Sequence, residues 1–259
     1  MDELPVPLAL SRFVRSMRVF TNTEFGSHYR RIPDCESELL IHVDAQRTAA
    51  TFFGTRTQAL EKPVTRSGKA VIVRFRAAGA YAFFREPMSA LTDRSSALED
   101  LWDPDARGPL FEARGPAAAA QATTAALESA LHSAAAREPA SVPAARRAVR
   151  LVRDATVVPS VSDLAGELGL SERQLRRVFD TVVGLPPKRF LRIVRFRRAL
   201  RAARASQRPD WASLAEQHGY FDQAHLIADF RALTGRTPSE LTAAQRRGAG
   251  HVAAAPERK

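Results

Sequence analysis

The second half of the chain contains an internal repeat, and this feature constrains the fold more than any other. Seven residues recur with matching spacing, at a shift of fifty residues before a predicted turn and fifty-one after it. The matched pairs are Leu164 with Leu214, Ala165 with Ala215, Gly169 with Gly219, Leu175 with Leu226, Phe179 with Phe230, Gly184 with Gly235, and Pro187 with Pro238. Self-similarity of this kind indicates two copies of one supersecondary unit.

Each copy has the residue pattern of a helix, a tight turn and a second helix. In the first copy we expect Ser162 to cap a short helix, Gly169 to end it and Ser171 to cap the next helix. Gly219 and Asp222 take the turn and capping positions in the second copy. The pattern therefore predicts two helix-turn-helix units.

The second helix of each unit exposes a polar or small face once its apolar residues turn inward. In the first unit Leu175 and Phe179 face the core at i, i+4 spacing. The residues on or near the outer face are Arg173, Gln174, Arg176 and Arg177 in the first unit and Gln223, Ala224, Ile227 and Ala228 in the second. A helix rich in Arg and Gln fits the DNA major groove, where Arg pairs with guanine and Gln with adenine. A generic helical hairpin is the alternative, and two copies in register on a basic segment disfavour it.

A long helix is predicted between the two units, from about Pro187 to Ala205, because proline suits the first helical turn. Its apolar stripe consists of Phe190, Ile193, Phe196, Leu200 and Ala203. Basic residues flank the stripe, with Lys188, Arg192 and Arg195 on one side and Arg197, Arg201 and Arg204 on the other. The helix would hold the two units so that they enter successive major grooves, about 34 Å apart. We expect Lys188, Arg192 and Arg195 to contact the DNA backbone.

All of the excess positive charge lies in the half that holds the repeat. The formal net charge is +11; residues 141–259 carry 22 Lys and Arg against 11 Asp and Glu, whereas residues 1–140 carry 17 of each kind. A localised basic field favours a polyanion through phosphate contacts and counterion release. The predicted partner is double-stranded DNA, and residues 141–243 are expected to bind it alone, as a monomer.

The composition also predicts the compartment. Cys35 is the single cysteine, so no internal disulfide can form, which fits a reducing environment. No apolar run is long enough for a transmembrane helix, and residues 1–10 lack the pattern of a signal peptide. We expect a cytoplasmic, nucleoid-associated protein without membrane contact.

The first half of the chain reads as a mainly β region over residues 8–85. Strands are predicted at 38–43, 48–53 and 70–75, where apolar or β-branched segments are bounded by turn residues. Helices are predicted at 95–102 and at the alanine-rich residues 116–137, the latter as a dimer interface or an internal strut. The fold class is α+β with two domains: a β-rich, jelly-roll-like or cupin-like domain at 1–112, an Ala-rich helix and linker at 113–142, an all-α domain with two helix-turn-helix units at 143–243, and a disordered tail at 244–259.

Several short runs in the second half carry a family resemblance. They are Ser162-Asp163-Leu164-Ala165, Gly169-Leu170-Ser171, Leu175-Arg176-Arg177-Val178-Phe179, Gly184-Leu185-Pro186-Pro187, Leu214-Ala215, Gly219-Tyr220, Leu226, Phe230 and Gly235-Arg236-Thr237-Pro238. Over residues 143–241 the chain thus resembles the AraC/XylS family of bacterial transcription regulators. The resemblance implies a seven-helix domain with two reading units, promoter binding, and RNA polymerase as a partner in activation.

The same resemblance implies where bases are read. In the first unit the contacts would fall on Arg173, Arg176 and Arg177. In the second unit Ala228 stands where the family often has Arg, and Ala224 is also short. That unit would therefore read bases through Gln223 and His225, and otherwise position the protein on the backbone.

Residues 8–105 resemble the β-rich sensor domain of one branch of that family, through the runs at 73–80 and 91–102. The turn Pro33-Asp34-Cys35 lacks the glycine usual there, which leaves its local geometry open. The likeness implies an unidentified small-molecule effector and leaves a homodimer open. The aromatic residues Phe53, Phe75, Tyr81 and Phe83, with Phe52 and Phe84, could line an apolar effector pocket or pack as core.

Two enzyme-like alternatives remain beside a regulator. His28, Asp34, Cys35 and His42 could suggest a metal site, but they lack the His-x-His or Cys-x-x-Cys pairing of metal-binding chains. Cys35 could be a nucleophile or alkyl acceptor, as in DNA-repair proteins with a similar DNA-binding domain, but no zinc-binding cysteines accompany it. We therefore predict an effector-controlled transcription regulator that is not an enzyme and needs no cofactor or metal. The alternative is a DNA-repair or metal-dependent enzyme that uses the helix-turn-helix domain for targeting.

Overall fold

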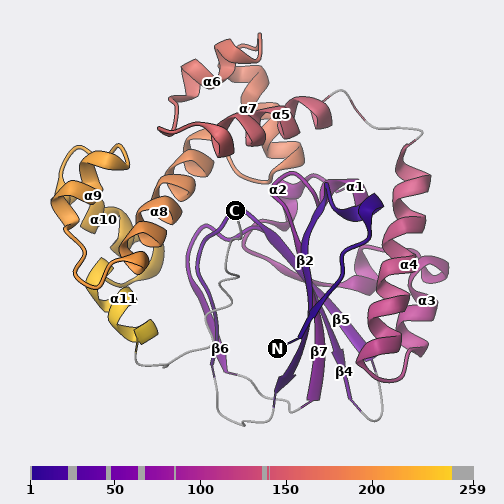
Figure 1. The fold of residues 1–259 in the computed structure, drawn as a ribbon. Coiled ribbons are helices and arrows are strands. Elements are labelled where there is room, and N and C mark those ends of the chain that lie inside the picture. The colour runs from indigo at the N-terminus through magenta and orange to yellow at the C-terminus, as the bar shows by residue number, and fades with distance from the viewer. Residues whose placement is uncertain are drawn as a thin grey trace.

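The structure, a computed structural model, describes residues 2–22, 28–44, 48–63, 68–84, 86–135, 139 and 141–246. Its first part is an antiparallel sheet with helices packed against it, and its second part is all helical (Figure 1). The helical part lies across one end of the sheet and continues along one side of it. The predicted α+β class, with a β-rich domain followed by a helical one, is confirmed.

The N-terminal domain is built on a six-stranded antiparallel sheet. In spatial order its strands are β1 (Asp2–Leu4), β2 (Val14–Asn22), β7 (Gly68–Phe75), β4 (Ser37–Val43), β5 (Thr48–Phe53) and β8 (Ser95–Ala97). A second antiparallel pair joins β3 (His28–Arg31) to β6 (Leu60–Pro63). The strands predicted at 38–43, 48–53 and 70–75 are therefore confirmed as β4, β5 and β7.

Strand β7 lies at the centre of the larger sheet, between β2 and β4. Val71 and Val73 are fully buried and pair with Ile41 and Leu39 of β4, which are also fully buried. Alternate residues of a strand point to the same face, so these four apolar side chains form one layer of the core.

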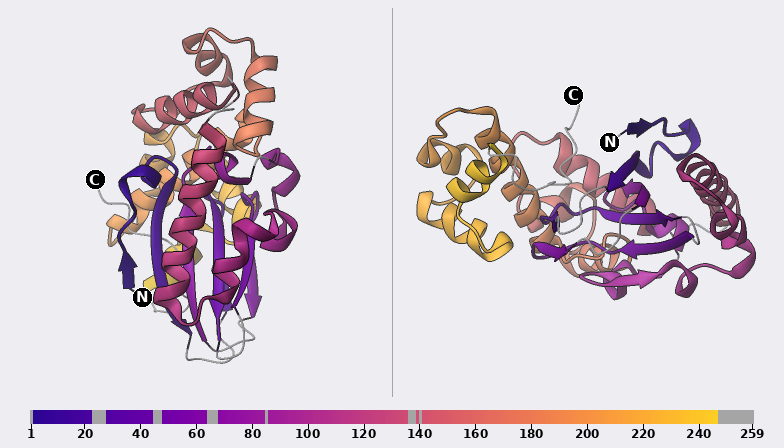
Figure 2. Two further views of the ribbon diagram at one scale, coloured as in Figure 1. Left: turned by 90° about the vertical axis from the view of Figure 1, so that its right-hand side faces the viewer. Right: turned by 90° about the horizontal axis from the view of Figure 1, so that it is seen from below.

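The described residues of this domain also form four α-helices: α1 (Tyr81–Phe84), α2 (Met88–Leu91), α3 (Pro104–Glu112) and α4 (Pro116–Ala135). Helix α4 runs along one face of the sheet (Figure 2). It buries Ala119, Thr123 and Leu127, which recur every four residues and so share one face. The helix predicted at 116–137 is confirmed as far as 135, and its packing favours the internal strut over the dimer interface.

The helix predicted at residues 95–102 is wrong. Residues 95–97 form strand β8, where Ser96 pairs with Phe52 of β5, and a 3-10 turn follows at Leu98–Asp100. Leu98 and Trp102 are still buried, so the apolar residues reach the core by another backbone path. Pairing with the sheet edge outweighs the local helical preference, which is a weak determinant beside tertiary contacts.

The C-terminal domain contains seven helices among the described residues. They are α5 (Ser141–Asp154), α6 (Val161–Glu167), α7 (Glu172–Val182), α8 (Pro187–Ala205), α9 (Trp211–Gln217), α10 (Gln223–Thr234) and α11 (Pro238–Arg246). The domain therefore starts two residues before the predicted boundary at 143, and helix continues past 243. The tail predicted to be disordered lies outside the described residues from 247 onward. None of the described helices is both long and apolar enough to cross a membrane.

The turns and caps of this domain follow the repeat with one correction. Gly169 and Gly219 both adopt left-handed backbone conformations, with φ of 66° and 72°. Helix α6 is capped by Ser160 and not by the predicted Ser162: the Ser160 hydroxyl accepts from the Asp163 N–H, and the Asp163 carboxylate accepts from the Ser160 N–H. Ser160 takes the role because its spacing from Asp163 allows this reciprocal pair.

Candidate nucleic-acid interface

The second helix of the first unit, α7, presents a basic outer face. Leu175 and Phe179 are fully buried, whereas Arg173, Arg176 and Arg177 are exposed, as the repeat predicted. Ser171 caps the helix by accepting from the Gln174 N–H at 3.2 Å. The arrangement puts three guanidinium groups on the solvent side of a rigid, capped helix.

Gln174 is exposed, but its side chain takes part in the cap of α7. Its Oε1 accepts a hydrogen bond from the Ser171 N–H at 2.8 Å, which completes the reciprocal cap of α7. A side-chain amide held in this way satisfies one of the unpaired N–H groups at the start of the helix. The Gln174 side chain is therefore part of the cap, and the three arginines are the other long polar side chains on this exposed face.

The second unit offers fewer polar groups on helix α10. Asp222 caps it by accepting from the His225 N–H at 2.7 Å, and Gln223 is exposed. The His225 ring contacts the turn that precedes α10. Its Nδ1 accepts from the Phe221 N–H at 3.3 Å, and the His225 and Tyr220 rings pack in a T-shaped arrangement. His225 thus supports the turn, which leaves Gln223 as the long polar side chain directed outward at the start of α10.

Two of the three predicted backbone-contact residues are engaged inside the domain. The Arg192 Nε donates to the Asp229 carboxylate at 2.7 Å, and the Arg195 guanidinium lies 5.5 Å from the centre of the Tyr220 ring. Both interactions tie α8 to the second unit. Lys188 is exposed. The sequence showed the basic stripe but not these partners, because Asp229 and Tyr220 lie on distant segments.

Tyr220 and its surroundings form a buried polar cluster between α8 and the second unit. Burial raises the pKa of Tyr220, and the nearby Asp229 carboxylate raises it further, although Arg195 and Arg192 act in the opposite direction. The phenol therefore stays protonated. Arg192 and Arg195 thus hold the second helix-turn-helix unit against α8, and a contact to phosphate would use their remaining N–H groups.

The other basic flank of α8 faces the N-terminal domain. Arg197 and Arg201 line a cavity shared with that domain. Arg204 is buried to an extent that lowers its pKa to about 10, with a further contribution from Arg197. The two basic flanks of α8 therefore face different parts of the molecule. Helical periodicity alone does not distinguish them.

Both helix-turn-helix units are tied to the N-terminal domain at equivalent places. In the first unit the Thr55 hydroxyl donates to the Val183 carbonyl at 3.3 Å, and the Thr92 hydroxyl donates to the Gly184 carbonyl. In the second unit the Ala59 N–H donates to the Leu233 carbonyl at 2.9 Å. These contacts meet the C-terminal ends of α7 and α10, so the N-terminal domain touches both helix-turn-helix units where each second helix ends.

The predicted effector-pocket aromatics pack mainly as core. The Phe75 and Phe83 rings lie 5.4 Å apart and are both buried. Phe53 is buried beside the Arg56 guanidinium, and Tyr81 is partly buried. None of the four predicted residues lines the cavity shared with α8. Their positions support the core interpretation.

Cys35 lies in the turn before β4, where it adopts a positive φ of 59°. Its side chain is buried, and its Sγ lies 3.7 Å from the Phe190 carbonyl oxygen of α8. Burial raises the pKa of the Cys35 thiol well above its usual value, and the Asp34 and Glu36 carboxylates raise it further. A thiolate nucleophile is therefore disfavoured, since reactive cysteines have a lowered pKa and access to solvent.

The candidate metal ligands are not assembled into a site in the part of the chain that the structure describes. No group of three or more His, Cys, Asp or Glu side chains there is placed to hold a metal ion. Asp34 instead accepts from Arg74 and from Arg31, at 3.3 Å for the latter. The side chain of His28 lies outside the described residues.

Two families match the chain, one in each domain. Residues 164–244 match the family described as a helix-turn-helix domain, and residues 2–97 match a domain of unknown function, DUF6597. No curated protein matches the chain.

Several solved structures are similar to it. A transcriptional regulator with an AraC-type DNA-binding domain from Chromobacterium violaceum is 26% identical over 40% of this chain and 92% of its own, with a TM-score of 0.37. ToxT from Vibrio cholerae is 11% identical over 87% of this chain and 97% of its own, with a TM-score of 0.45. A ToxT structure with a bound unsaturated fatty acid is 12% identical over 87% and 93%, with a TM-score of 0.41.

Proposed function

We propose that this chain is a DNA-binding transcription regulator of the AraC type, and that its N-terminal domain controls DNA binding in response to an effector. The premise is that residues 164–244 form a helix-turn-helix domain. The observation that carries the proposal is the set of three hydrogen bonds from the N-terminal domain to the ends of α7 and α10. A change in the N-terminal domain would reach both reading units through these contacts.

Sequence specificity resides mainly in the first unit under this proposal. Arg173, Arg176 and Arg177 are exposed on α7, and guanidinium groups recognise guanine through paired hydrogen bonds. On α10 the corresponding face has exposed Ala224 and Ala228, which offer no hydrogen bond to a base edge. The second unit reads through Gln223 with a smaller part for His225.

The remaining basic residues orient the protein on the duplex. Lys188 is exposed near the start of α8 and is the proposed contact to a phosphate. Arg192 and Arg195 add to the positive field there while they hold the second unit against α8. Phosphate contacts of this kind set position and orientation but carry no sequence information.

The proposal has consequences for partners and location. A regulator acts on transcription at promoters, so RNA polymerase is its proposed partner, and the protein would reside with the nucleoid in the cytoplasm. The effector is a small molecule bound within reach of the N-terminal domain. A homodimer stays a prediction, and the packing of α4 on the sheet does not supply it.

The test is base recognition by the arginines of α7. Arg176→Ala or Arg177→Ala should weaken binding to the selected DNA site by about 1–3 kcal/mol and relax base preference at one position. Binding sites selected from a random DNA library by the full chain supply the target. Arg94→Ala, an exposed arginine of the N-terminal domain, is the matched control and should leave binding unchanged. An unchanged footprint for both α7 variants would contradict the assignment.

A further inference from the structure

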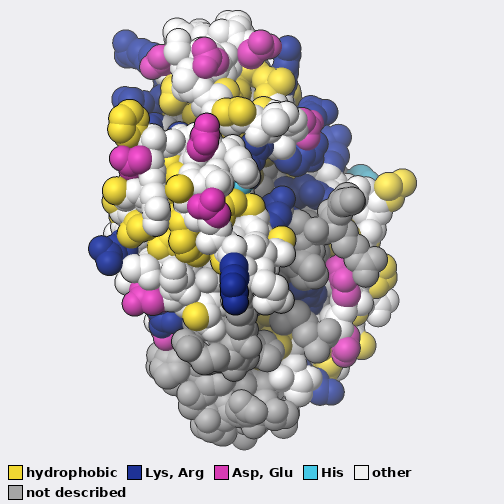
Figure 3. All heavy atoms as spheres, turned by 60° about the vertical axis from the view of Figure 1, so that its left-hand side comes forward, with side chains coloured by type: hydrophobic (Ala, Val, Ile, Leu, Met, Phe, Trp, Pro, Cys, Tyr) yellow, Lys and Arg dark blue, Asp and Glu magenta, His cyan; other side chains and the backbone are white. Residues whose placement is uncertain are grey.

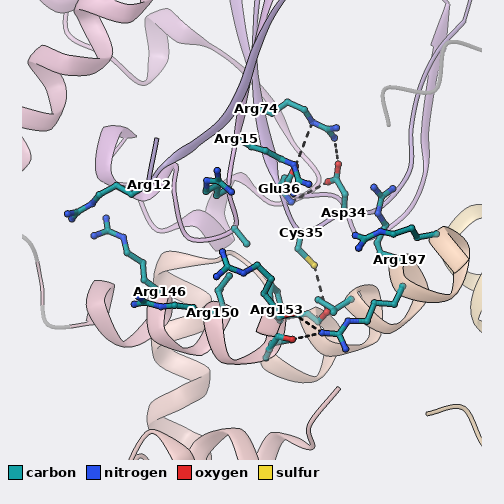
Figure 4. Close-up of a pocket in the computed structure, with 18 of the residues that line it drawn as sticks. Arg12, Arg15, Asp34, Cys35, Glu36, Arg74, Arg146, Arg150, Arg153 and Arg197 are labelled. Carbon is teal, nitrogen blue, oxygen red and sulfur yellow. Dashed lines mark hydrogen bonds and ion pairs between the residues drawn. The ribbon is translucent and has the colours of Figure 1, made fainter. Parts of the chain in front are cut away.

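A cavity of about 780 Å³ lies between the two domains. The start of β2, the turn before β4 and the end of β7 form its N-terminal side, and helices α5 and α8 form the other (Figure 4). Figure 3 shows Lys and Arg side chains gathered around a recess beside the upper helices. The volume falls within the range of about 300–1,000 Å³ that is typical of small-molecule sites.

The lining of this cavity is strongly basic. Among the described residues, ten arginines from both domains line it, against two carboxylates, Asp34 and Glu36. Figure 4 shows Arg12 and Arg15 on the N-terminal side, opposite Arg146 and Arg150 of α5. These arginines belong to opposite walls of one hollow, and a convex DNA-binding face would not need that arrangement.

The two carboxylates are already committed to arginines at the floor of the cavity. Asp34 accepts from Arg74 and from Arg31, and Glu36 accepts from the Arg15 guanidinium at 2.6 Å. Both acids have nearly inaccessible side chains. They fix the floor, and Arg153 on the wall pairs with a third carboxylate, Asp154, at 2.8 Å.

Two wall arginines have no such partner. Arg150 of α5 and Arg197 of α8 make no hydrogen bond or ion pair with another described residue. Burial lowers the pKa of Arg197, and the charges of Arg74 and Arg15 lower it further against the opposing effect of Asp34 and Glu36. The pKa of Arg201 is lowered by burial and by Arg197 and Arg15. The charged guanidinium groups repel one another, and an anion placed between them would relieve the repulsion.

We propose that this cavity binds a small ligand with several negative charges, a metabolite that carries two or more phosphate groups, and that this ligand is the effector. The planar fork of arginine forms paired hydrogen bonds with phosphate oxygens, and ten such groups around one cavity suit a polyphosphorylated ligand. A monocarboxylate would neutralise a single charge. The role as effector rests on the proposed function, whereas binding itself does not.

The position of the cavity connects ligand binding with DNA binding. Helix α8 contributes Arg197 and Arg201 to the cavity and Phe196 to the core that holds α10, where the Phe196 and Phe230 rings lie 4.7 Å apart. A bound polyanion would draw α5 and α8 toward the N-terminal wall. The ligand would therefore change how firmly the two domains are held together.

The experiment uses the full chain and inorganic tripolyphosphate as the probe, measured by titration calorimetry at physiological salt. Inorganic phosphate and decanoate serve as comparison ligands. Tripolyphosphate should bind at least tenfold more tightly than either. Arg150→Gln and Arg197→Gln should each weaken its binding about tenfold, since a hydrogen bond to a charged group contributes this much. Arg94→Gln removes the same charge from an exposed site outside the cavity and should have no effect.

Each outcome of these titrations either supports or overturns the proposed anion site. Equal weakening by Arg94→Gln, tighter binding of decanoate, or no heat from tripolyphosphate would overturn the proposal. Loss of tripolyphosphate binding in an Arg173→Gln, Arg176→Gln and Arg177→Gln triple variant would also overturn it, because the phosphates would then occupy the DNA-binding face. Arg150 is exposed, so its variant should fold normally, and unchanged circular dichroism confirms this.

A DNA footprint without added ligand separates this inference from the proposed function. If the footprint is present and tripolyphosphate does not bind, the cavity proposal fails and the regulator stands. If tripolyphosphate binds at the cavity and no sequence-specific footprint is found, the regulator fails and the anion site stands. If both hold, tripolyphosphate near its wild-type dissociation constant should shift the DNA affinity of the wild-type chain by severalfold, and should shift that of Arg150→Gln much less at the same concentration.

Discussion

Gly184 sits where the first reading unit meets the N-terminal domain, and Gly184→Ala tests that contact. Its φ is +83°, a conformation that costs an L-residue about 1–2 kcal/mol. A Cβ built there would lie 2.7 Å from the Met88 carbonyl oxygen and 2.8 Å from the Thr92 hydroxyl oxygen of the N-terminal domain. Forcing an atom into such a packed contact costs about 1–3 kcal/mol more. We expect Gly184→Ala to lower the free energy of unfolding by about 2–5 kcal/mol.

Gly235 is the matched control because it is the repeat partner of Gly184. Its φ is +71°, but beyond its chain neighbours no described atom lies within 4 Å of the position that a Cβ would take. Gly235→Ala should therefore cost only the conformational strain, about 1–2 kcal/mol. Urea denaturation followed by circular dichroism gives both values. Hydrogen exchange at Met88 to Thr92 should accelerate in Gly184→Ala only. Equal destabilisation by the two substitutions, without faster exchange in that segment, would refute the reasoning.

Two further predictions concern the turn before β4. Cys35 should react slowly with iodoacetamide in the folded protein at pH 8 and rapidly after denaturation, because burial and the neighbouring carboxylates raise the pKa of its thiol. Mass spectrometry of the labelled chain measures the rate of labelling. Fast labelling of the folded protein would contradict the prediction. Burial alone would raise the pKa of Asp34, but Arg31, Arg74, Arg197 and the Glu36 N–H lower it below its usual value. Its contribution to stability should therefore be complete above about pH 4, the usual Asp pKa, and be lost as the pH falls through the lower folded-state value. Asp34→Asn should destabilise the protein at pH 7 by about 3–5 kcal/mol, and should remove this part of the pH dependence of the melting temperature. A pH dependence of melting that is unchanged in the variant would count against the assignment.

The reading units were largely predictable because their determinants are local. Gly169 ends a helix through its own backbone conformation, and Ser171 and Asp222 cap the helices that follow them within three residues. The i, i+4 spacing of Leu175 and Phe179 identified the buried face of α7. The cap of α6 could also be predicted from the sequence, because Ser160 and Asp163 have the spacing of a capping box.

The partners of the basic residues were not predictable, because they depend on how distant segments meet. Arg192 and Asp229 are 37 residues apart and belong to different helices, so periodicity shows a charged stripe without its partner. The cavity could be predicted from the sequence even less. Arg15 and Arg197 are 182 residues apart in the chain, and the even charge balance of residues 1–140 gives no sign that four of its arginines line one cavity.

The mechanical consequence of helix α8 follows from its length. Its 19 residues span about 28 Å at 1.5 Å per residue. A rod of that length that pivots by about 5° at one end displaces its other end by about 2.5 Å, which is close to half the rise of one helical turn. Hydrogen bonds to base edges tolerate only a few tenths of an ångström. A rotation too small to disturb the core of either domain would thus move one reading unit out of register with its groove while the other stayed in place.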